Sequence, residues 1–92
     1  METEKQVEQY LKKEVTKRGA LCLKMNPLVN RGIPDRLVVM DKKVCFVELK
    51  KEKGVLSEAQ KYFIRELKDR GCNVSVLYSK KDVNKFIKEN FK

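Results

Sequence analysis

Histidine is absent from this chain of 92 residues. Its absence excludes a Ser-His-Asp triad, a Cys-His pair and a histidine general base. Any catalysis by this chain must therefore use carboxylates, lysine or a metal ion.

Cysteine is scarce, and Cys22, Cys45 and Cys72 are the whole set. No C-x-x-C motif occurs, and without histidine a zinc site lacks its usual ligands. Each cysteine lies inside a predicted strand, and free cysteine is among the most buried residue types. We therefore predict that all three are small buried side chains.

Long hydrophobic runs are absent as well. No apolar segment approaches the roughly 18 residues that a membrane-spanning helix needs, and Met1–Glu4 lacks the apolar core of a signal peptide. We expect a cytoplasmic location. The length and a hydrophobic content of 41% predict a single domain over residues 1–92.

Basic residues are abundant: 22 Lys and Arg stand against 13 Asp and Glu, for a net charge of +9. Such an excess is the electrostatic footprint of a nucleic-acid binder. A ribosomal-type protein or a soluble lysine-rich domain fits the same charge. Charge alone therefore does not choose a function.

Capping boxes and apolar periodicity predict three helices. Thr3–Gln6 has the form of a capping box, and the spacing after it predicts a helix over residues 4–18. Ser57–Gln60 is a second capping box, heading a helix that ends before Gly71, and Ser79 opens a last helix.

Four strands separate these helices. They are expected at residues 21–25, 35–40, 43–50 and 72–78, with an irregular segment at 26–34. The order is αβββαβα, and a crossover through the second helix makes the last two strands parallel. The sequence thus predicts an α/β fold with a mixed sheet, covered on its two faces by the first and second helices.

The register of the two middle strands is the most informative feature. If residues 35–40 and 43–50 pair across a turn of two or four residues, paired numbers sum to 83. Asp35 then lies opposite Glu48, and Lys50 projects to the same face because strand side chains alternate. Opposed like charges on a sheet are unfavourable. A hard cation would neutralise them, and Mg²⁺ typically binds through one or two carboxylates.

The turn leaves an alternative open. Asp41-Lys42 is not the Asn-Gly or Asp-Gly pair that two-residue hairpins prefer, and a three-residue loop would separate the carboxylates onto opposite faces. Asp35 is then a turn residue and Glu48 a solvated charge. We favour the functional interpretation because strand 43–50 is apolar on both faces, and charges are costly to bury in such a strand.

Three motifs resemble a known family. Gly32–Arg36 reads G-I-P-D-R, Phe46–Lys50 reads F-V-E-L-K and Leu56–Gln60 reads L-S-E-A-Q. In this order, inside an αβββαβ pattern, they resemble the PD-(D/E)XK superfamily and, more narrowly, the stand-alone VRR-NUC domains encoded by phages. The resemblance covers most of the chain and implies a restriction-endonuclease-like αβββαβ(α) core.

The resemblance implies a metal-dependent nuclease. Asp35, Glu48 and the backbone carbonyl of Leu49 would bind Mg²⁺ or Mn²⁺. Lys50 would position the attacking water and stabilise the charge that develops on the phosphate.

Two further side chains have both a family role and an ordinary one. The family places a glutamate of the first helix near the metal: Glu8 is our choice, and Glu4, one turn away, is the second candidate. Taken alone, Glu8 is a solvated helix charge. Gln60 would touch water at the metal or the nucleic-acid backbone, and it also fits as the capping partner of Ser57.

Five basic residues surround the proposed site in the sequence. As candidate phosphate contacts they carry no base preference. For each one singly a solvated surface charge is the commoner explanation, and the argument for a phosphate role is their clustering around two acids. They are Lys24, Arg31, Arg36, Lys51 and Lys53.

These inferences predict a metal-dependent, structure-specific DNA endonuclease that hydrolyses phosphodiester bonds in branched DNA, similar to Holliday-junction resolvases. Such family members look like symmetric homodimers, and one chain of this length holds one active site, so we expect a homodimer. We expect no small-molecule cofactor and no membrane partner, and a host-cell cytoplasmic location if a phage encodes the chain. The alternatives are a catalytically silent nucleic-acid-binding module of the same fold and a structural or regulatory interaction protein.

Overall fold

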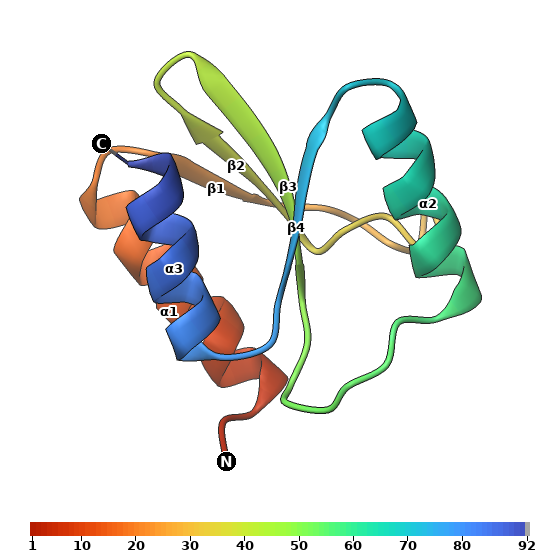
Figure 1. Ribbon diagram of the computed structural model, residues 1–92, viewed down its shortest axis with the longest axis horizontal. Coiled ribbons are helices and arrows are strands. Elements are labelled where there is room, and N and C mark those ends of the chain that lie inside the picture. The colour runs from red at the N-terminus through yellow and green to blue at the C-terminus, as the bar shows by residue number, and fades with distance from the viewer. Residues whose placement is uncertain (92) are drawn as a thin grey trace.

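Seven elements follow one another in the computed structural model, which describes residues 1–91 (Figure 1). The αβββαβα order is the predicted one, and the boundaries differ from the predictions by only a few residues. The elements are α1 (Glu4–Lys17), β1 (Leu21–Lys24), β2 (Arg36–Met40), β3 (Lys43–Leu49), α2 (Glu58–Asp69), β4 (Asn73–Leu77) and α3 (Lys80–Asn90).

The predicted capping boxes form at the starts of the first two helices. In α1 the Thr3 hydroxyl accepts a hydrogen bond from the Gln6 amide at 3.1 Å, and the Gln6 side chain accepts one from the Thr3 amide at 2.9 Å. Ser57 and Gln60 make the same pair of bonds in α2. Each box satisfies amide groups that have no partner within the helix.

The sheet has the strand order β1-β2-β3-β4, antiparallel at the first two junctions and parallel between β3 and β4. The β2–β3 register runs from Met40 opposite Lys43 to Arg36 opposite Val47, so paired numbers sum to 83 as predicted. The turn has two residues despite its unfavourable sequence, and Lys42 adopts a left-handed φ of 57°.

One face of the sheet carries the hydrophobic core, and we call it the covered face. Its strand residues Val38, Cys45, Val47, Leu49 and Leu77 are buried against apolar residues of both α1 and α3. The predicted placement of the first helix on one face is confirmed, whereas the position of α3 beside it on the same face was not predicted. After β4 the chain returns along the covered face, and the apolar stripe of α3 packs beside α1 there (Figure 1).

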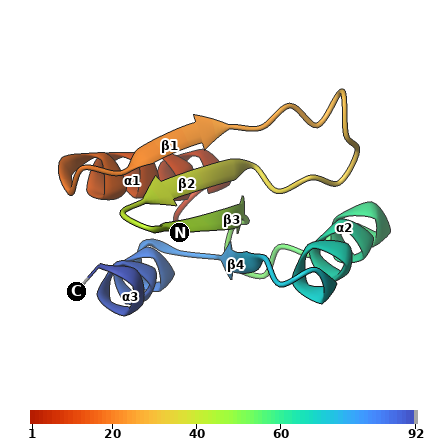
Figure 2. The same ribbon diagram turned by 90° about the horizontal axis from the view of Figure 1, so that it is seen from above.

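The opposite face, which we call the open face, has only α2 over it. That helix lies beside β4, while the β1–β2 side of the same face has no helix above it (Figure 2). The register lays apolar side chains across the open face in two lateral rows. The first row is Leu21, Val39 and Val44, and the second is Leu23, Leu37, Phe46 and Val74.

The cysteines are buried to different degrees. Cys45 is buried on the covered face, and burial raises the pKa of its thiol. Cys22 and Cys72 are only half-buried, and Cys72 precedes β4. The prediction of three buried cysteines was wrong for these two, because one lies on an edge strand and the other at a strand end. Over residues 1–91 no helix has the length and apolar character to cross a membrane.

Candidate active site

A third lateral row of the open face is acidic. Extending the β2–β3 register by one residue places Asp35 opposite Glu48, and the charge of Asp35 contributes to the raised pKa of Glu48. Asp35 is oriented by the backbone of β3, since its Oδ2 accepts a hydrogen bond from the Leu49 amide at 2.8 Å. The two acids therefore share a face, as the register count predicted.

Glu48 is almost completely buried, with 1% of its surface exposed. Its Oε2 accepts a hydrogen bond from Gln60 Nε2 at 3.2 Å, while its Oε1 has no hydrogen-bond partner. Burial, followed by the charge and proximity of Asp35, raises the pKa of Glu48 to about 8, and Lys50 opposes that rise. A buried carboxyl group with one unpartnered oxygen is costly unless a cation compensates it.

The segment Asn26–Pro34 and the start of α2 cover this acidic row. A backbone hydrogen bond of 2.9 Å from the Met25 amide to the Asp35 carbonyl closes the base of the segment. Gly32 packs against the first turn of α2, where a Cβ would lie 2.4 Å from the carbonyl oxygen of Ala59. Gly32 also has a φ of 88°, so both space and backbone conformation require glycine there.

A cavity of about 600 Å³ lies between this segment and α2. Its lining includes Arg31, Asp35 and Gln60, so it opens beside the acidic row. Figure 2 shows the connecting segment extending past the strand ends alongside α2. The cavity therefore reaches Asp35, whereas Glu48 is not among its lining residues.

Gln60 serves both of the roles that the sequence suggested. Its Oε1 accepts the Ser57 amide in the capping box at 2.8 Å, and its Nε2 donates to Glu48. The cap thereby holds the amide group in place against the buried carboxyl group. A single side chain thus couples the start of α2 to the acidic row.

Lys50 follows β3 and is half-buried. Its amide donates to the Leu77 carbonyl at 2.9 Å, which ties its backbone to β4. Its side chain lies beside Gly54, and its charge favours the ionised form of Glu48. The ammonium charge of Lys50 therefore acts on Glu48.

The two candidate glutamates of α1 lie in different surroundings. Glu8 Oε2 is 2.7 Å from Arg36 Nε and 3.4 Å from Lys24 Nζ, so its carboxylate is already neutralised by two cations. Glu4 is exposed, and its charge contributes to the raised pKa of Glu48. Of the two glutamates, Glu4, the second candidate, is thus the one whose charge acts on Glu48.

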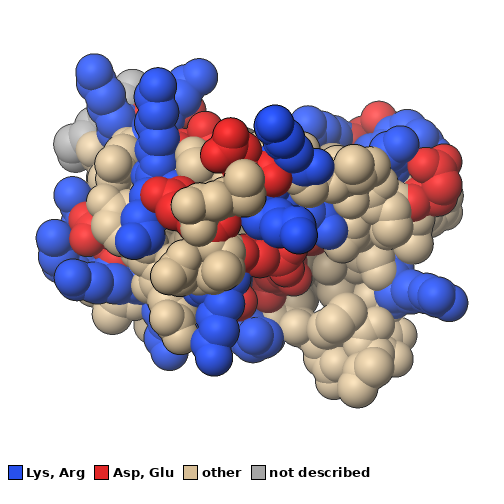
Figure 3. All heavy atoms as spheres, turned by 90° about the horizontal axis from the view of Figure 1, so that it is seen from below, with Lys and Arg blue, Asp and Glu red and all other residues tan. Residues whose placement is uncertain are grey.

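The five candidate phosphate contacts divide into two groups. Arg31, Lys51 and Lys53 are exposed and follow or precede the acidic row closely in the chain. Arg36 projects to the covered face, is 11% exposed and pairs with Glu8 together with Lys24. The predicted phosphate role therefore does not fit Arg36, whose guanidinium group donates to Glu8 and to the Cys22 carbonyl inside the protein. Figure 3 shows acidic side chains at several places on one side of the molecule, with Lys and Arg interspersed among them.

The residues present fit a divalent cation. No group of three or more His, Cys, Asp or Glu positioned to hold a metal occurs in the described part of the chain. Mg²⁺ does not require one, because it binds through one or two carboxylates and retains several waters. The unpartnered Oε1 of Glu48 and the raised pKa of its carboxyl group are both relieved by a nearby cation.

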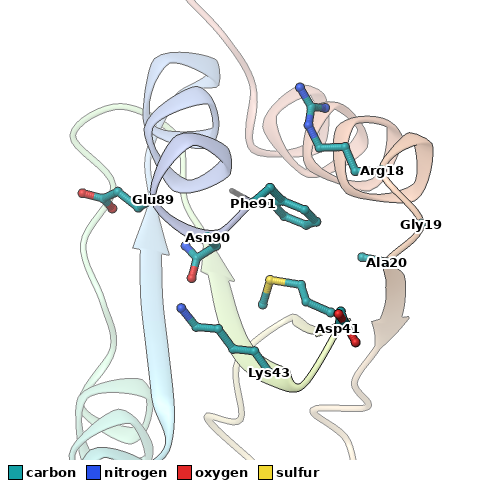
Figure 4. Close-up of a pocket in the computed structure, with 9 residues that line it drawn as sticks. Arg18, Gly19, Ala20, Asp41, Lys43, Glu89, Asn90 and Phe91 are labelled. Carbon is teal, nitrogen blue, oxygen red and sulfur yellow. The ribbon is translucent and has the colours of Figure 1, made fainter.

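A second cavity lies away from these acids. Its volume is about 540 Å³, and its lining includes Arg18, Met40, Lys43 and Phe91 (Figure 4). It adjoins the β2–β3 turn, whereas Glu48 lies at the other end of β3. Arg18 is held by Glu14 at 3.0 Å. This cavity is not part of the acidic site.

Comparisons with known proteins agree with the fold and the motifs. The family model described as VRR-NUC domain matches residues 1–81. A solved structure described as a VRR-NUC domain is 30% identical in sequence and superposes with a TM-score of 0.84 over 99% of this chain and 100% of that one. No curated protein matches the chain.

The roles of three residues were not apparent from the sequence. Gly32 stood inside a recognised motif, but its contact with Ala59 depends on how α2 packs. Glu4 and Glu8 lie one turn apart, and spacing alone does not separate them. Only the partners of each carboxylate distinguish them.

Proposed function

This chain belongs to the VRR-NUC family, a nuclease-type domain family, and on that premise we propose that it is a metal-dependent endonuclease acting on branched DNA. The observation that carries the proposal is the pair of Asp35 and Glu48, with one buried oxygen of Glu48 left without a partner beside Lys50. Buried charged groups clustered next to a cavity are characteristic of functional sites.

The proposed ligands are Asp35, Glu48 and the carbonyl oxygen of Leu49. A divalent ion bound there, Mg²⁺ or Mn²⁺, would offset the phosphate charge and lower the pKa of water toward neutrality. The protein supplies the geometry, since the Leu49 amide orients Asp35 and the Gln60 amide group orients Glu48. Both carboxylates are thus held before the substrate arrives.

Lys50 is proposed to act directly on the phosphate. Its charge favours the ionised form of Glu48, and its ammonium group would donate hydrogen bonds to oxygens on which charge develops. It would also orient the attacking water. No histidine is needed for this chemistry, in agreement with the composition.

The substrate is proposed to be held through its phosphates by Arg31, Lys51 and Lys53. These side chains are exposed and flank the acidic row in the chain. Contacts of this kind read backbone shape rather than base sequence. Such contacts fit recognition of nucleic-acid shape, and we propose branched DNA as the substrate.

We further propose that the active form is a homodimer similar to a Holliday-junction resolvase. Each chain has one acid pair, and symmetric incision of two strands needs two of them related by a two-fold axis. The alternative is a module of the same fold that binds nucleic acid without cutting it. The intact set of Asp35, Glu48 and Lys50 favours the nuclease.

Cleavage of labelled branched DNA tests the proposal. The wild-type chain is expected to release products with Mg²⁺ and none with EDTA, and Lys50→Ala is expected to be inactive. Asp41→Asn, which changes an exposed acid in the β2–β3 turn, is the matched control and should cut normally. If the wild-type chain binds the DNA but leaves it intact with either metal, the binding module is the correct interpretation.

A further inference from the structure

We propose that the tip of the segment between β1 and β2, formed by Leu28 and Val29, is a wedge that enters the base stack of the nucleic acid at its branch point. The inference deepens the proposed function and rests on it, because it names the side chains that would recognise a branch. Its physical basis is an apolar pair that projects into solvent beside the candidate active site. An apolar side chain inserted between two base pairs unstacks them and bends the duplex.

The tip is the most solvent-exposed apolar feature of the protein. Over residues 1–91, Leu28 is the most exposed large apolar residue, at 94%, and the adjacent Val29 is 74% exposed. Two other apolar residues of the same segment are turned inward, since Pro34 is buried and Ile33 half-buried. The segment thus contributes one apolar pair to the fold and presents the other to solvent. This exposure forfeits hydrophobic free energy unless another molecule buries the pair.

The backbone of the tip is held by hydrogen bonds on both sides. The Asn26 side-chain Oδ1 accepts a bond from the Leu28 amide at 2.9 Å, and the Asn26 carbonyl accepts one from the Val29 amide at 3.2 Å. After the tip, the Asn30 carbonyl accepts a bond from the Ile33 amide at 3.1 Å. Because these turns already order the chain, binding through the tip costs less conformational entropy than binding through an unstructured loop.

The tip begins at the rim of the cavity of about 600 Å³ that reaches Asp35. Pro27, which precedes Leu28, lines this cavity, and so does Arg31, which follows the tip. The segment extends past the strand ends alongside α2 (Figure 2). A branch point that is unstacked by the tip would therefore present its phosphates next to the proposed metal ligands.

The size and surroundings of the tip favour nucleic acid over a protein partner. Arg31 is exposed and lies two residues after Val29, so a cation that can bind phosphate accompanies the apolar pair. Two side chains are too few for a protein contact, since a standard stable interface buries about 800 Å² per partner. They suit a base step, because DNA-bending proteins insert apolar side chains such as leucine between successive base pairs.

A wedge supplies the preference for a branch that phosphate contacts do not. Contacts to phosphates are available along linear and branched DNA alike. Unstacking a base step is costly within a continuous duplex and costs less where pairing or stacking is already interrupted, as it is at a branch point. The tip would therefore add affinity selectively at the branch.

Fluorescence of 2-aminopurine placed at the branch point tests the wedge, because the emission of this base rises when it unstacks. The DNA is mixed with the full chain in EDTA, so the readout does not depend on cleavage. Wild type is expected to raise the emission from branched DNA and not from a linear duplex. Leu28→Ser should still bind through phosphates without raising the emission. Its preference for branched over linear DNA should fall by about tenfold, as expected when one leucine side chain is no longer buried.

Val55→Ser is the matched control. Val55 is 78% exposed and lies in the connection between β3 and α2, outside the tip, so its variant should unstack the branch like wild type. Val29→Ser serves as a second variant of the tip. Circular dichroism checks that each variant folds, and sedimentation of wild type and Leu28→Ser reports whether the tip joins two copies of the chain instead.

The outcomes separate this inference from the proposed function. Wild-type binding without a rise in emission, no binding, or the same rise with Leu28→Ser and Val29→Ser overturns the wedge. Self-association that Leu28→Ser abolishes while unstacking persists assigns the tip to a second copy and overturns it too. None of these results excludes metal-dependent cleavage by Asp35 and Glu48. Conversely, a chain that unstacks the branch through Leu28 but never cuts it with Mg²⁺ supports the wedge and rejects the endonuclease.

Discussion

The two faces of this sheet are built from the same strands but differ in what they bury. The covered face buries apolar side chains against α1 and α3. Among the strand residues of the open face, the one that is fully buried is a glutamate, Glu48, while apolar neighbours such as Leu21 and Leu23 remain exposed. The side chains that form the hydrophobic core are therefore concentrated on the covered face, and the candidate active-site residues lie on the open face.

The composition of the open face lowers the stability of the fold in two ways, and such a loss is typical of a functional surface. Burying the Glu48 carboxyl group beside Asp35 disfavours its ionised form. Exposing apolar residues on the same face forfeits hydrophobic free energy of about 25 cal/mol per Å². A domain selected only for stability would expose the carboxyl group and bury the apolar residues. The predictions below test the contrast, from the largest expected effect to the smallest.

Removing one acid of the open face should have the largest effect. Asp35→Asn keeps the size of the side chain but removes a proposed metal ligand, whose loss costs several kcal/mol of transition-state stabilisation. Cleavage of branched DNA should fall by at least about 10³-fold, measured in single-turnover reactions with Mg²⁺. Normal cleavage by Asp35→Asn would reject the acid pair as the metal site.

Truncations on the two faces should differ in their effect on folding. Leu49→Ala on the covered face should lower the free energy of unfolding by about 2–5 kcal/mol, because Leu49 is fully buried. Leu23→Ala on the open face, studied at concentrations where the chain is monomeric, should cost less than about 1 kcal/mol. Urea denaturation measures both. Equal losses of unfolding free energy in the two variants would contradict the difference between the two faces.

The pH dependence of metal-free stability should report the buried acid. Because the pKa of Glu48 is about 8 in the fold and near 4.5 when unfolded, the folded state holds the extra proton between these values. The contribution of Glu48 to the free energy of unfolding is thus fully present below about pH 4.5. It decreases as pH rises toward 8, by on the order of a few kcal/mol. Urea denaturation at several pH values measures the slope.

Two controls accompany that measurement. Glu48→Gln should flatten the slope, since the amide does not titrate, and saturating Mg²⁺ should offset the loss at high pH. A wild-type slope that Glu48→Gln leaves unchanged would assign the titration to another group.

The smallest expected effects are those of replacing the two glutamates of α1, and they should differ between Glu8 and Glu4. Glu8→Gln should destabilise the fold by about 1–3 kcal/mol, because Arg36 is left buried without its carboxylate. Glu4→Gln should leave the free energy of unfolding within about 0.5 kcal/mol and weaken Mg²⁺ binding slightly, measured by calorimetry. If Glu8→Gln weakened Mg²⁺ binding more than Glu4→Gln did, the family-based choice of Glu8 would be restored.

The elements of the fold that sequence reasoning predicted correctly are local ones. Thr3 and Ser57 begin helices because their hydroxyl groups accept amides three residues on. Asp35 and Glu48 lie opposite each other because a two-residue turn and strand alternation specify the register. Each of these features depends on a few neighbouring residues.

The misplaced features depend on packing between distant segments. Arg36 was predicted to contact phosphate, but the rotation of α1 on the sheet pairs it with Glu8. The second helix was predicted to cover one face of the sheet, and α2 lies on that face but only beside β4. Periodicity shows which side of a helix is apolar and does not reveal which surface it will meet.

From the sequence alone came the motifs, the strand register and the alignment of two acids and one lysine on a single face, because strand geometry is set by local alternation. The tertiary structure decided how exposed each of these three side chains is to solvent. Glu48 is buried because Gly32 closes onto Ala59 and Gln60 reaches back from α2, contacts between residues that are distant in the chain. Burial is a property of the assembled fold, and it is burial that turns an ordinary glutamate into a candidate ligand for a metal ion.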